Sequence, residues 1–361
     1  MKVLHILSEL QFSGAELMLS TAAEKFKEAG LDVTILSTGP EEGVYAEYFR
    51  KIGWHVAHIP FRKTIGFFMQ LFKFTKKNQF DVIHVHTEGA FIYKAFTVYF
   101  AGSKRIVSTV HNNFLFDTYL TKRRKMHHYL ASKFLKVRFT SISESVKETE
   151  LVIYNTETTL INNWIDVDRF KQKRLDNVKP SDINEKITVP RLVSVGKCID
   201  IKNHQANFEL VKELVSRGIN CHYIHIGCGE LEETEKAWVK KNQLEQYVTF
   251  ISYTDRVADY LASCDFYLMP SHCEGLGNAC VEAMASRLFC IVNDAPGLNT
   301  LIEDDVTGLV LDANNIPLVA DQIVKFCNDK EEYNRITHNA QDAVAKKYSL
   351  KNVDQLIEVY A

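Results

Sequence analysis

The sequence predicts an α/β protein in which two doubly wound parallel sheets form separate domains. Short apolar runs that are typical of buried strands alternate with helical periodicities along nearly the whole chain. This alternation produces parallel sheets with helices on both faces. The chain has 361 residues, and its expected strands are too many for one sheet of average size. A polar stretch at 171–190 contains two prolines and separates the strands into two groups, as an interdomain linker would.

Each expected domain has its own set of strands. The first domain covers residues 1–170, with strands at 2–7, 32–36, 82–85, 106–110 and 139–142 and a helix at 16–29. The second covers 191–347, with strands at 191–195, 221–226, 248–251, 265–269 and 289–292 and helices at 204–216, 232–241 and 317–328. The last segment, 348–361, has the apolar spacing of a short helix but no following strand to pair with.

Composition excludes several classes of protein. Apolar residues make up 46% and charged residues 24%, as in ordinary soluble proteins. The net charge of −2 gives no reason to expect a nucleic-acid partner. No apolar run reaches the length of about 18 residues that a membrane-spanning helix needs, and the first ten residues alternate like a strand rather than a signal peptide.

The eight cysteines indicate in which cellular compartment the protein is expected and whether it contains a structural metal ion. All of them follow residue 190, none forms a CxxC pair, and most lie in apolar stretches. Reduced, buried thiols are therefore expected, which favours a cytoplasmic protein. The ligand spacing of a structural zinc site is missing, so we expect no metal.

Two stretches of the first domain contain basic but no acidic residues. They cover 48–80 and 118–143, and the second includes Arg123 and Arg124. Both interleave basic with large apolar side chains, a pattern that suits contact with anionic lipid. The alternative is two ordinary helices with solvated outer faces.

The densest group of candidate site residues lies at 271–286, between an expected strand and helix. Gly275 and Gly277 would let the backbone approach a ligand, and the helix start presents free N–H groups to an anion. Glu274 and Glu282 could each accept hydrogen bonds from sugar hydroxyls. A glycine-containing turn with two glutamates can also occur by chance.

Further candidates follow other strands of both domains. Lys197 and Lys202 follow the strand at 191–195 and could neutralise a diphosphate. Gly227 and Gly229 form a tight turn that does not extend to the dinucleotide motif GxGxxG, because position 232 is glutamate. Each of these signals is weak by itself.

In the first domain, Gly14 opens a helix directly after the first strand. His111 ends the strand at 106–110, where an imidazole could donate a hydrogen bond or exchange a proton. His84 and His86 face one side of their strand, but no third metal ligand is apparent. His86 remains a candidate for a side chain at the edge of a cleft.

Taken in order, these motifs resemble a family. The succession runs from TVH at 109–111 through SISE at 141–144 and NNWIDVDRF at 162–170 to VGK, IGCGE and E-x7-E. It is similar to the retaining glycosyltransferases of the large sucrose-synthase-like family, which includes bacterial capsule, exopolysaccharide and lipopolysaccharide transferases. That family has the GT-B architecture of two Rossmann-like domains. The chain departs from the usual pattern at Ser13, Arg287, Phe289 and Thr300.

The resemblance implies a function and a role for each candidate. The expected enzyme moves a sugar, with retention, from a nucleotide-diphosphate sugar to a lipid-linked or saccharide acceptor, without metal or cofactor. UDP is the expected nucleotide and GDP the second choice. The resemblance assigns catalytic roles to His111 and Glu274, diphosphate binding to Gly14, Lys197, Lys202, Gly275, Leu276, Gly277 and Asn278, and ribose binding to Glu282. Their places after strands or in basic stretches add Gly227, Gly229, Tyr253 and Thr254 as nucleotide-binding candidates and His86, Arg123 and Arg124 as acceptor-side candidates.

Two other interpretations remain open from the sequence. One is a non-catalytic protein that binds a nucleotide sugar or acts as a scaffold. The other is a nucleotide-sugar epimerase or phosphorylase of the same architecture. A transferase would act at the inner face of the membrane, with the C-terminal helix returning to the first domain.

Overall fold

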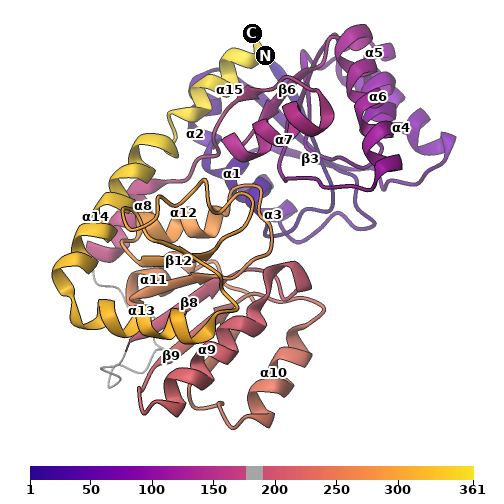
Figure 1. The fold of residues 1–361 in the computed structure, drawn as a ribbon. Helices are drawn as coiled ribbons and strands as arrows, with labels where there is room; N and C mark the ends of the chain where they lie inside the picture. The colour runs from indigo at the N-terminus through magenta and orange to yellow at the C-terminus, as the bar shows by residue number, and fades with distance from the viewer. Residues whose placement is uncertain (176–189) are drawn as a thin grey trace. The chain divides into compact units, whose positions relative to one another are not determined.

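A computed structural model describes residues 1–175 and 190–361, and the chain divides into two compact units (Figure 1). Unit 1 contains Met1–Ile165 together with Leu350–Ala361, and unit 2 contains Asp166–Ser349. The boundary therefore falls earlier in the chain than the predicted 170. Most of the predicted linker at 171–190 lies outside the described residues.

Unit 1 is built on a seven-stranded parallel sheet in the order β3-β2-β1-β4-β5-β6-β7. Its strands are β1 (Lys2–Leu7), β2 (Asp32–Ser37), β3 (His55–His58), β4 (Val82–Val85), β5 (Arg105–Val110), β6 (Arg138–Ser141) and β7 (Thr159–Leu160). Its helices are α1 (Gly14–Thr21), α2 (Ala23–Glu28), α3 (Ala46–Lys51), α4 (Ile65–Asn78), α5 (Phe91–Phe100), α6 (Thr118–Leu135), α7 (Glu144–Tyr154) and α15 (Asn352–Tyr360). The helix predicted at 16–29 is thus two helices.

Both faces of this sheet are buried, as the apolar strand sequences require. Along β1, Val3 and Leu7 belong to the core beneath α1, α2, α3 and α15, whereas Leu4 and Ile6 belong to the core beneath α4, α5 and α6. The two cores follow the alternation of side chains along a strand. The C-terminal helix α15 therefore packs within unit 1.

Unit 2 contains a six-stranded parallel sheet in the order β10-β9-β8-β11-β12-β13. Its strands are β8 (Arg191–Val195), β9 (His222–Ile226), β10 (Val248–Ile251), β11 (Phe266–Met269), β12 (Phe289–Asn293) and β13 (Leu309–Leu311). Its helices are α8 (Val167–Leu175), α9 (His204–Ser216), α10 (Glu232–Lys241), α11 (Val257–Ser263), α12 (Asn278–Ala285), α13 (Ile316–Asn328) and α14 (Lys330–Lys347), with a 3-10 turn at Asp200–Lys202.

The strand order places one switch point in each sheet. In unit 1, β1 lies between β2 and β4, and in unit 2, β8 lies between β9 and β11. Open α/β sheets bind ligands outside the carboxyl ends of the strands at such points. The predicted fold class of two doubly wound parallel sheets is confirmed.

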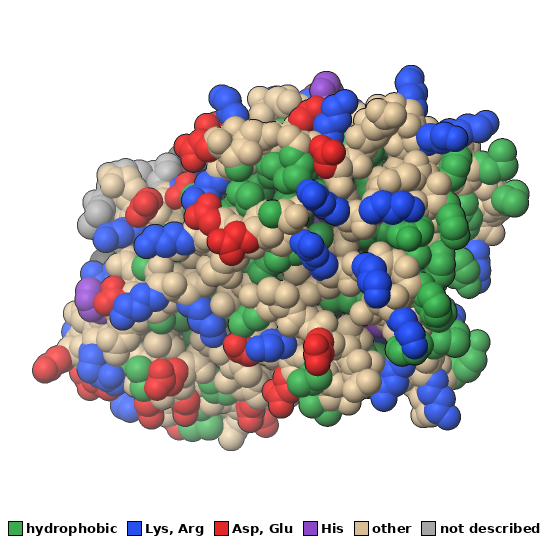
Figure 2. Space-filling model, turned by 90° about the horizontal axis from the view of Figure 1, so that it is seen from above, with side chains coloured by type: hydrophobic (Ala, Val, Ile, Leu, Met, Phe, Trp, Pro, Cys, Tyr) green, Lys and Arg blue, Asp and Glu red, His purple; other side chains and the backbone are tan. Residues whose placement is uncertain are grey.

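The surface of unit 1 around α4, α5 and α6 combines apolar and basic side chains. Figure 2 shows these two kinds of side chain together at the right edge of the molecule, where acidic side chains are sparse. Exposed apolar residues on these helices are Ile65, Met69, Tyr93, Phe100, Tyr119, Met126, Tyr129 and Phe134. Among the described residues, no helix is both long and apolar enough to cross a bilayer.

Candidate functional site

Unit 1 has a pocket of about 370 Å³ at its switch point, within the usual size range of small-molecule sites. The loops that follow β1, β4 and β5 supply most of its walls. The lining residues are Leu7, Ser8, Ser13, Ala15, Glu16, Thr38, Phe61, His86, Thr87, Glu88, Gly89, Lys94, His111, Asn112 and Phe114. Two predicted residues, His86 and His111, therefore line one pocket, and Gly14 lies between two lining residues.

A row of three histidines runs from the core of unit 1 into this pocket. His5 Nδ1 lies 2.9 Å from His86 Nε2, and His86 Nδ1 lies 2.9 Å from His111 Nε2. Burial lowers the pKa of His111 to about 4 and that of His5 to about 3, and it lowers the pKa of His86 well below its usual value. All three imidazoles are therefore neutral at pH 7, so that each has one N–H donor and one acceptor.

His84, two residues before His86, does not line the pocket. Its Nδ1 lies 2.6 Å from the Tyr360 hydroxyl and its Nε2 lies 2.6 Å from Thr109 Oγ1. The nitrogens of His5, His84 and His86 are close enough together to hold a metal ion, and His5 is the third ligand that the sequence did not reveal. Both nitrogens of His84 already have hydrogen-bond partners, so a metal would have to replace one of them.

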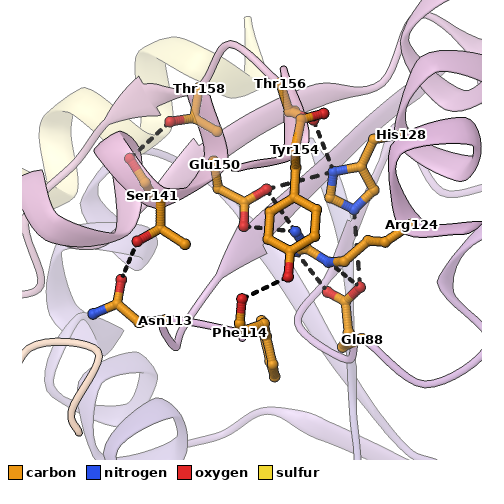
Figure 3. Close-up of polar contacts among 11 residues, drawn as sticks. Glu88, Asn113, Phe114, Arg124, His128, Ser141, Glu150, Tyr154, Thr156 and Thr158 are labelled. Atoms are coloured by element: carbon orange, nitrogen blue, oxygen red, sulfur yellow. Dashed lines mark hydrogen bonds and ion pairs between the residues drawn. The ribbon is translucent and has the colours of Figure 1, made fainter. Parts of the chain in front are cut away.

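Arg124 lies inside unit 1 and is held by two carboxylates (Figure 3). Its guanidinium donates to both oxygens of Glu88, at 2.7 and 3.1 Å, and to Glu150 at 2.7 Å. It also lies 4.1 Å from the ring centroid of Tyr154. Burial raises the pKa of Glu150 to about 7, although Arg124 acts in the opposite direction.

This arrangement gives the two predicted acceptor-side arginines different surroundings. Arg124 is only 4% exposed and does not line the pocket, but it fixes Glu88, which does. Arg123 is exposed on the same helix and does not line the pocket. The link from Arg124 to the pocket therefore passes through Glu88.

In unit 2, the predicted donor residues lie on loops and a helix that follow the strands. Lys202 Nζ donates to Glu274 Oε1 at 2.5 Å, so that the loops after β8 and β11 are joined by an ion pair. Lys197 is exposed on the first of these loops. Gly277, with φ of +83°, caps α12, and a Cβ atom there would lie 3.0 Å from Leu298.

Glu282 lies on α12, which packs against α8. Burial raises the pKa of Glu282 to about 7, and the charge of Arg169 on α8 lowers it in part. Sequence reasoning missed Arg169 as a site residue, although it belongs to the NNWIDVDRF motif. The remaining predicted residues, Leu276 and Asn278 next to Gly277 and Tyr253 and Thr254 after β10, lie in the same unit.

The glycines of the turn after β9 are required by backbone packing. Gly227 has φ of +155°, and a Cβ atom there would lie 1.8 Å from the Gly196 carbonyl oxygen. A Cβ atom on Gly229 would lie 2.5 Å from the Cys198 carbonyl oxygen. The two predicted nucleotide-turn glycines thus let the loops after β8 and β9 touch.

Beneath these loops lies a buried group of Cys198, His225 and Glu235, whose ligand atoms could also hold a metal ion. Cys198 Sγ is 3.2 Å from His225 Nε2, and Ser194 Oγ is 3.1 Å from His225 Nδ1. Burial raises the pKa of the Cys198 thiol, which keeps it protonated. All eight cysteines are free thiols.

Comparisons with known proteins match both units. Residues 12–169 match the model of "Glycosyltransferase Family 4", and residues 177–343 match that of "Glycosyl transferases group 1". The chain is 24% identical to an Escherichia coli UDP-Gal:alpha-D-GlcNAc-diphosphoundecaprenol alpha-1,3-galactosyltransferase, covering 81% of this chain and 78% of that protein. It is 25% identical to the Staphylococcus aureus capsular polysaccharide biosynthesis glycosyltransferase CapM, covering 93% of this chain and 90% of the relative.

A solved structure has the same fold. The crystal structure of Anabaena Alr3699/HepE in complex with UDP and glucose superposes with a TM-score of 0.81, covering 99% of this chain and 98% of that one, at 16% identity. At that identity the likeness concerns the fold, which has the GT-B architecture.

Proposed function

Because the chain belongs to the group 1 glycosyltransferases of the GT-B architecture, we propose that it transfers a sugar, with retention and without metal, from a UDP-sugar to a lipid-linked acceptor in polysaccharide biosynthesis. The observation that carries this proposal is the placement of the candidate residues. In unit 1, Gly14, His86 and His111 follow β1, β4 and β5, and in unit 2 the candidates for the diphosphate and the transferred sugar follow β8 and β11, at the switch point of each sheet.

The donor nucleotide is assigned to unit 2. Lys197, Lys202 and the amides at the start of α12 stabilise the diphosphate as it gains negative charge on leaving. Glu282 accepts hydrogen bonds from the ribose hydroxyls, and Glu274 contacts the transferred sugar. UDP is preferred because the Escherichia coli relative is named for UDP-Gal and the Anabaena structure holds UDP.

In the transfer itself, the leaving phosphate accepts the proton of the acceptor hydroxyl on the face from which it departs. The residues matched to the family supply no carboxylate nucleophile of the kind that retaining glycosidases use. His111, neutral and fixed by His86, donates a hydrogen bond to the transferred sugar as positive charge develops on its anomeric carbon. A neutral imidazole suits this position better than an imidazolium cation, because the cation would repel the positive charge that develops on the sugar.

The acceptor is assigned to the pocket of unit 1. The E. coli relative is named for a diphosphoundecaprenol acceptor, and a lipid-linked acceptor requires the enzyme to reach a membrane. We assign that contact to α4, α5 and α6, whose exposed surface combines basic and apolar side chains. The protein then works at the cytoplasmic face of the membrane as a peripheral enzyme.

The first experiment is a thermal shift of the purified chain with UDP, GDP, ADP and TDP, without added metal. A ligand at about 100 times its Kd adds about 2.7 kcal/mol of stability, and we expect this response from UDP. Lys202→Met should lose it, whereas the matched exposed-lysine variant Lys240→Met should keep it. No response to any diphosphate would overturn the donor assignment.

The competing interpretation, a protein that binds the nucleotide sugar without catalysis, is separated by turnover. A transferase releases UDP slowly from its UDP-sugar by transfer to water, and a binding protein does not. His111→Ala is expected to lose this release while keeping the UDP-induced thermal shift. Equal release from the variant and the parent would contradict the role given to His111.

A further inference from the structure

The pocket of unit 1 contains a buried ammonium group that the proposed transfer does not use. Lys94, on α5, lines the pocket and is only 2% exposed. Its Nζ donates to Thr87 Oγ1 at 2.7 Å and lies 5.2 Å from the ring centroid of Phe61. An ammonium has three N–H donors, so a hydroxyl and a ring face leave part of its capacity unused.

Within the described ranges, 1–175 and 190–361, the hydrogen bond of the Lys94 ammonium goes to a hydroxyl and none of the ion pairs includes Lys94. Burial alone lowers the pKa of Lys94 to about 8, with no charged neighbour contributing to the shift. The lysine is therefore still mostly a cation at pH 7. A buried ion without a partner is unfavourable, and a group whose pKa is shifted by burial inside a pocket is a candidate for a functional site.

The acidic residues of the pocket are occupied elsewhere. Both oxygens of Glu88 are bound by Arg124, which is itself held by Glu150. Glu16 accepts a hydrogen bond from Ser13, at the start of α1. Glu88 is therefore paired with Arg124 and not with Lys94, and the positive charge of Lys94 stays available inside the pocket.

We propose that Lys94 binds an anionic oxygen group of the acceptor, a phosphate or a carboxylate, in the pocket of unit 1. This inference rests on the proposed function, because it places the acceptor there. The anion accepts hydrogen bonds from the Lys94 ammonium and from the Thr87 hydroxyl next to it. A phosphate would belong to the diphosphate of a lipid-linked acceptor, and a carboxylate would belong to an acidic sugar.

The test uses the full chain with saturating UDP, so that the diphosphate site of unit 2 is filled. Inorganic pyrophosphate and glucuronate are then added separately, with sodium chloride of equal ionic strength as the reference, and the thermal shift is measured at pH 7. We expect one anion to raise the melting temperature of the parent chain. Pyrophosphate would identify the lipid diphosphate as the source, and glucuronate would identify an acidic sugar.

Two variants make the test specific. Lys94→Met keeps the length of the side chain, removes the buried charge and should abolish the response, while melting no lower than the parent without anion. Lys104→Met removes an exposed lysine just after the same helix and should respond like the parent. The response of the parent should also fade as the pH rises through about 8, because Lys94 then loses its proton.

Three results would overturn the proposal: no anion response in the parent, an equal response in Lys94→Met, or a response that is unchanged at pH 9.5. Failure of the proposed function gives a different result. In that case UDP would produce no shift by itself, while an anion response that depends on Lys94 would remain.

Discussion

At the scale of single residues, Arg124 shows that the sequence can predict the charge of a side chain without predicting its partners. The sequence places it in a basic stretch and assigns it to the acceptor side. In the structure its partners, Glu88 and Glu150, lie 36 and 26 residues away. Lys94 and His5 were missed for the same reason, since only the folded sheet brings them to the histidine row and the pocket. The type of each residue predicted its charge, but its partners could be identified only from the folded structure.

The cluster in Figure 3 predicts a stability change that depends on pH. Arg124→Met leaves two carboxylates without their cation, and breaking a buried pair costs about 3–5 kcal/mol. The raised pKa of Glu150 means that the folded state holds the proton more tightly than the unfolded state. The stability that this group contributes is complete below its unfolded pKa of 4.5 and is lost as the pH rises through about 7.

Urea unfolding of the parent and Arg124→Met at pH 5.5 and pH 8 measures this effect. The loss of unfolding free energy should be smaller at pH 5.5, where Glu150 can be neutral. Adding Glu150→Gln to Arg124→Met should recover part of the loss at pH 8. A loss of the same size at both pH values, unaffected by the second change, would argue against a role for the Glu150 charge.

At the scale of elements, the sequence predicted strands that are buried on both faces and missed shorter or more polar ones. Most residues of β1, β4, β5, β8 and β11 are buried, whereas β3 has no fully buried residue and β7 has two residues. Edge and near-edge strands bury less, so their pattern is weak. The break between α1 and α2 at Ala22 also leaves no signal, because an alanine is favourable in any helix.

The helices α4, α5 and α6 carry the prediction on membrane contact. Lys73, Lys76 and Lys77 are exposed on α4, and each basic residue near an anionic surface contributes about 1 kcal/mol. Changing all three to glutamate should therefore reduce binding to phosphatidylglycerol vesicles by at least about tenfold in cosedimentation. Binding of the parent should weaken as salt is added.

The matched control reverses charges on a different helix. Lys240→Glu with Lys241→Glu changes two exposed lysines of α10 in unit 2 and should leave vesicle binding close to that of the parent. Neutral phosphatidylcholine vesicles should bind weakly in every case. If the α10 variant lost as much binding as the α4 variant, the contact would be general electrostatic attraction and not a surface of unit 1.

At the scale of the whole molecule, the order of motifs predicted more than any single motif could. Each glycine turn or lysine pair was weak by itself, yet their succession identified the family. The alternation of strands and helices predicted the two parallel sheets, and both predictions are confirmed. The catalytic and donor roles stay predictions. The order of strands and loops can be predicted because it follows directly from the sequence. The position of a ligand cannot, because it depends on side chains that come together only when the chain folds.

The last prediction at this scale is whether catalysis requires a metal ion. Two groups among the described residues could hold one: His5, His84 and His86 in unit 1, and Cys198, His225 and Glu235 in unit 2. In the first group both nitrogens of His84 have hydrogen-bond partners, and in the second group both nitrogens of His225 do. Under the proposed function, Lys197 and Lys202 provide the positive charge for the diphosphate. We therefore expect exhaustive treatment with EDTA to change UDP release from the UDP-sugar by less than about twofold. Lys202→Met should lower it by about a hundredfold or more, the usual effect of losing one preorganised group that stabilises transition-state charge. Activity that falls with EDTA and returns with Mg²⁺ or Mn²⁺ would instead mean that a metal ion neutralises the leaving diphosphate, and the lysines would then have to be reassigned to binding alone.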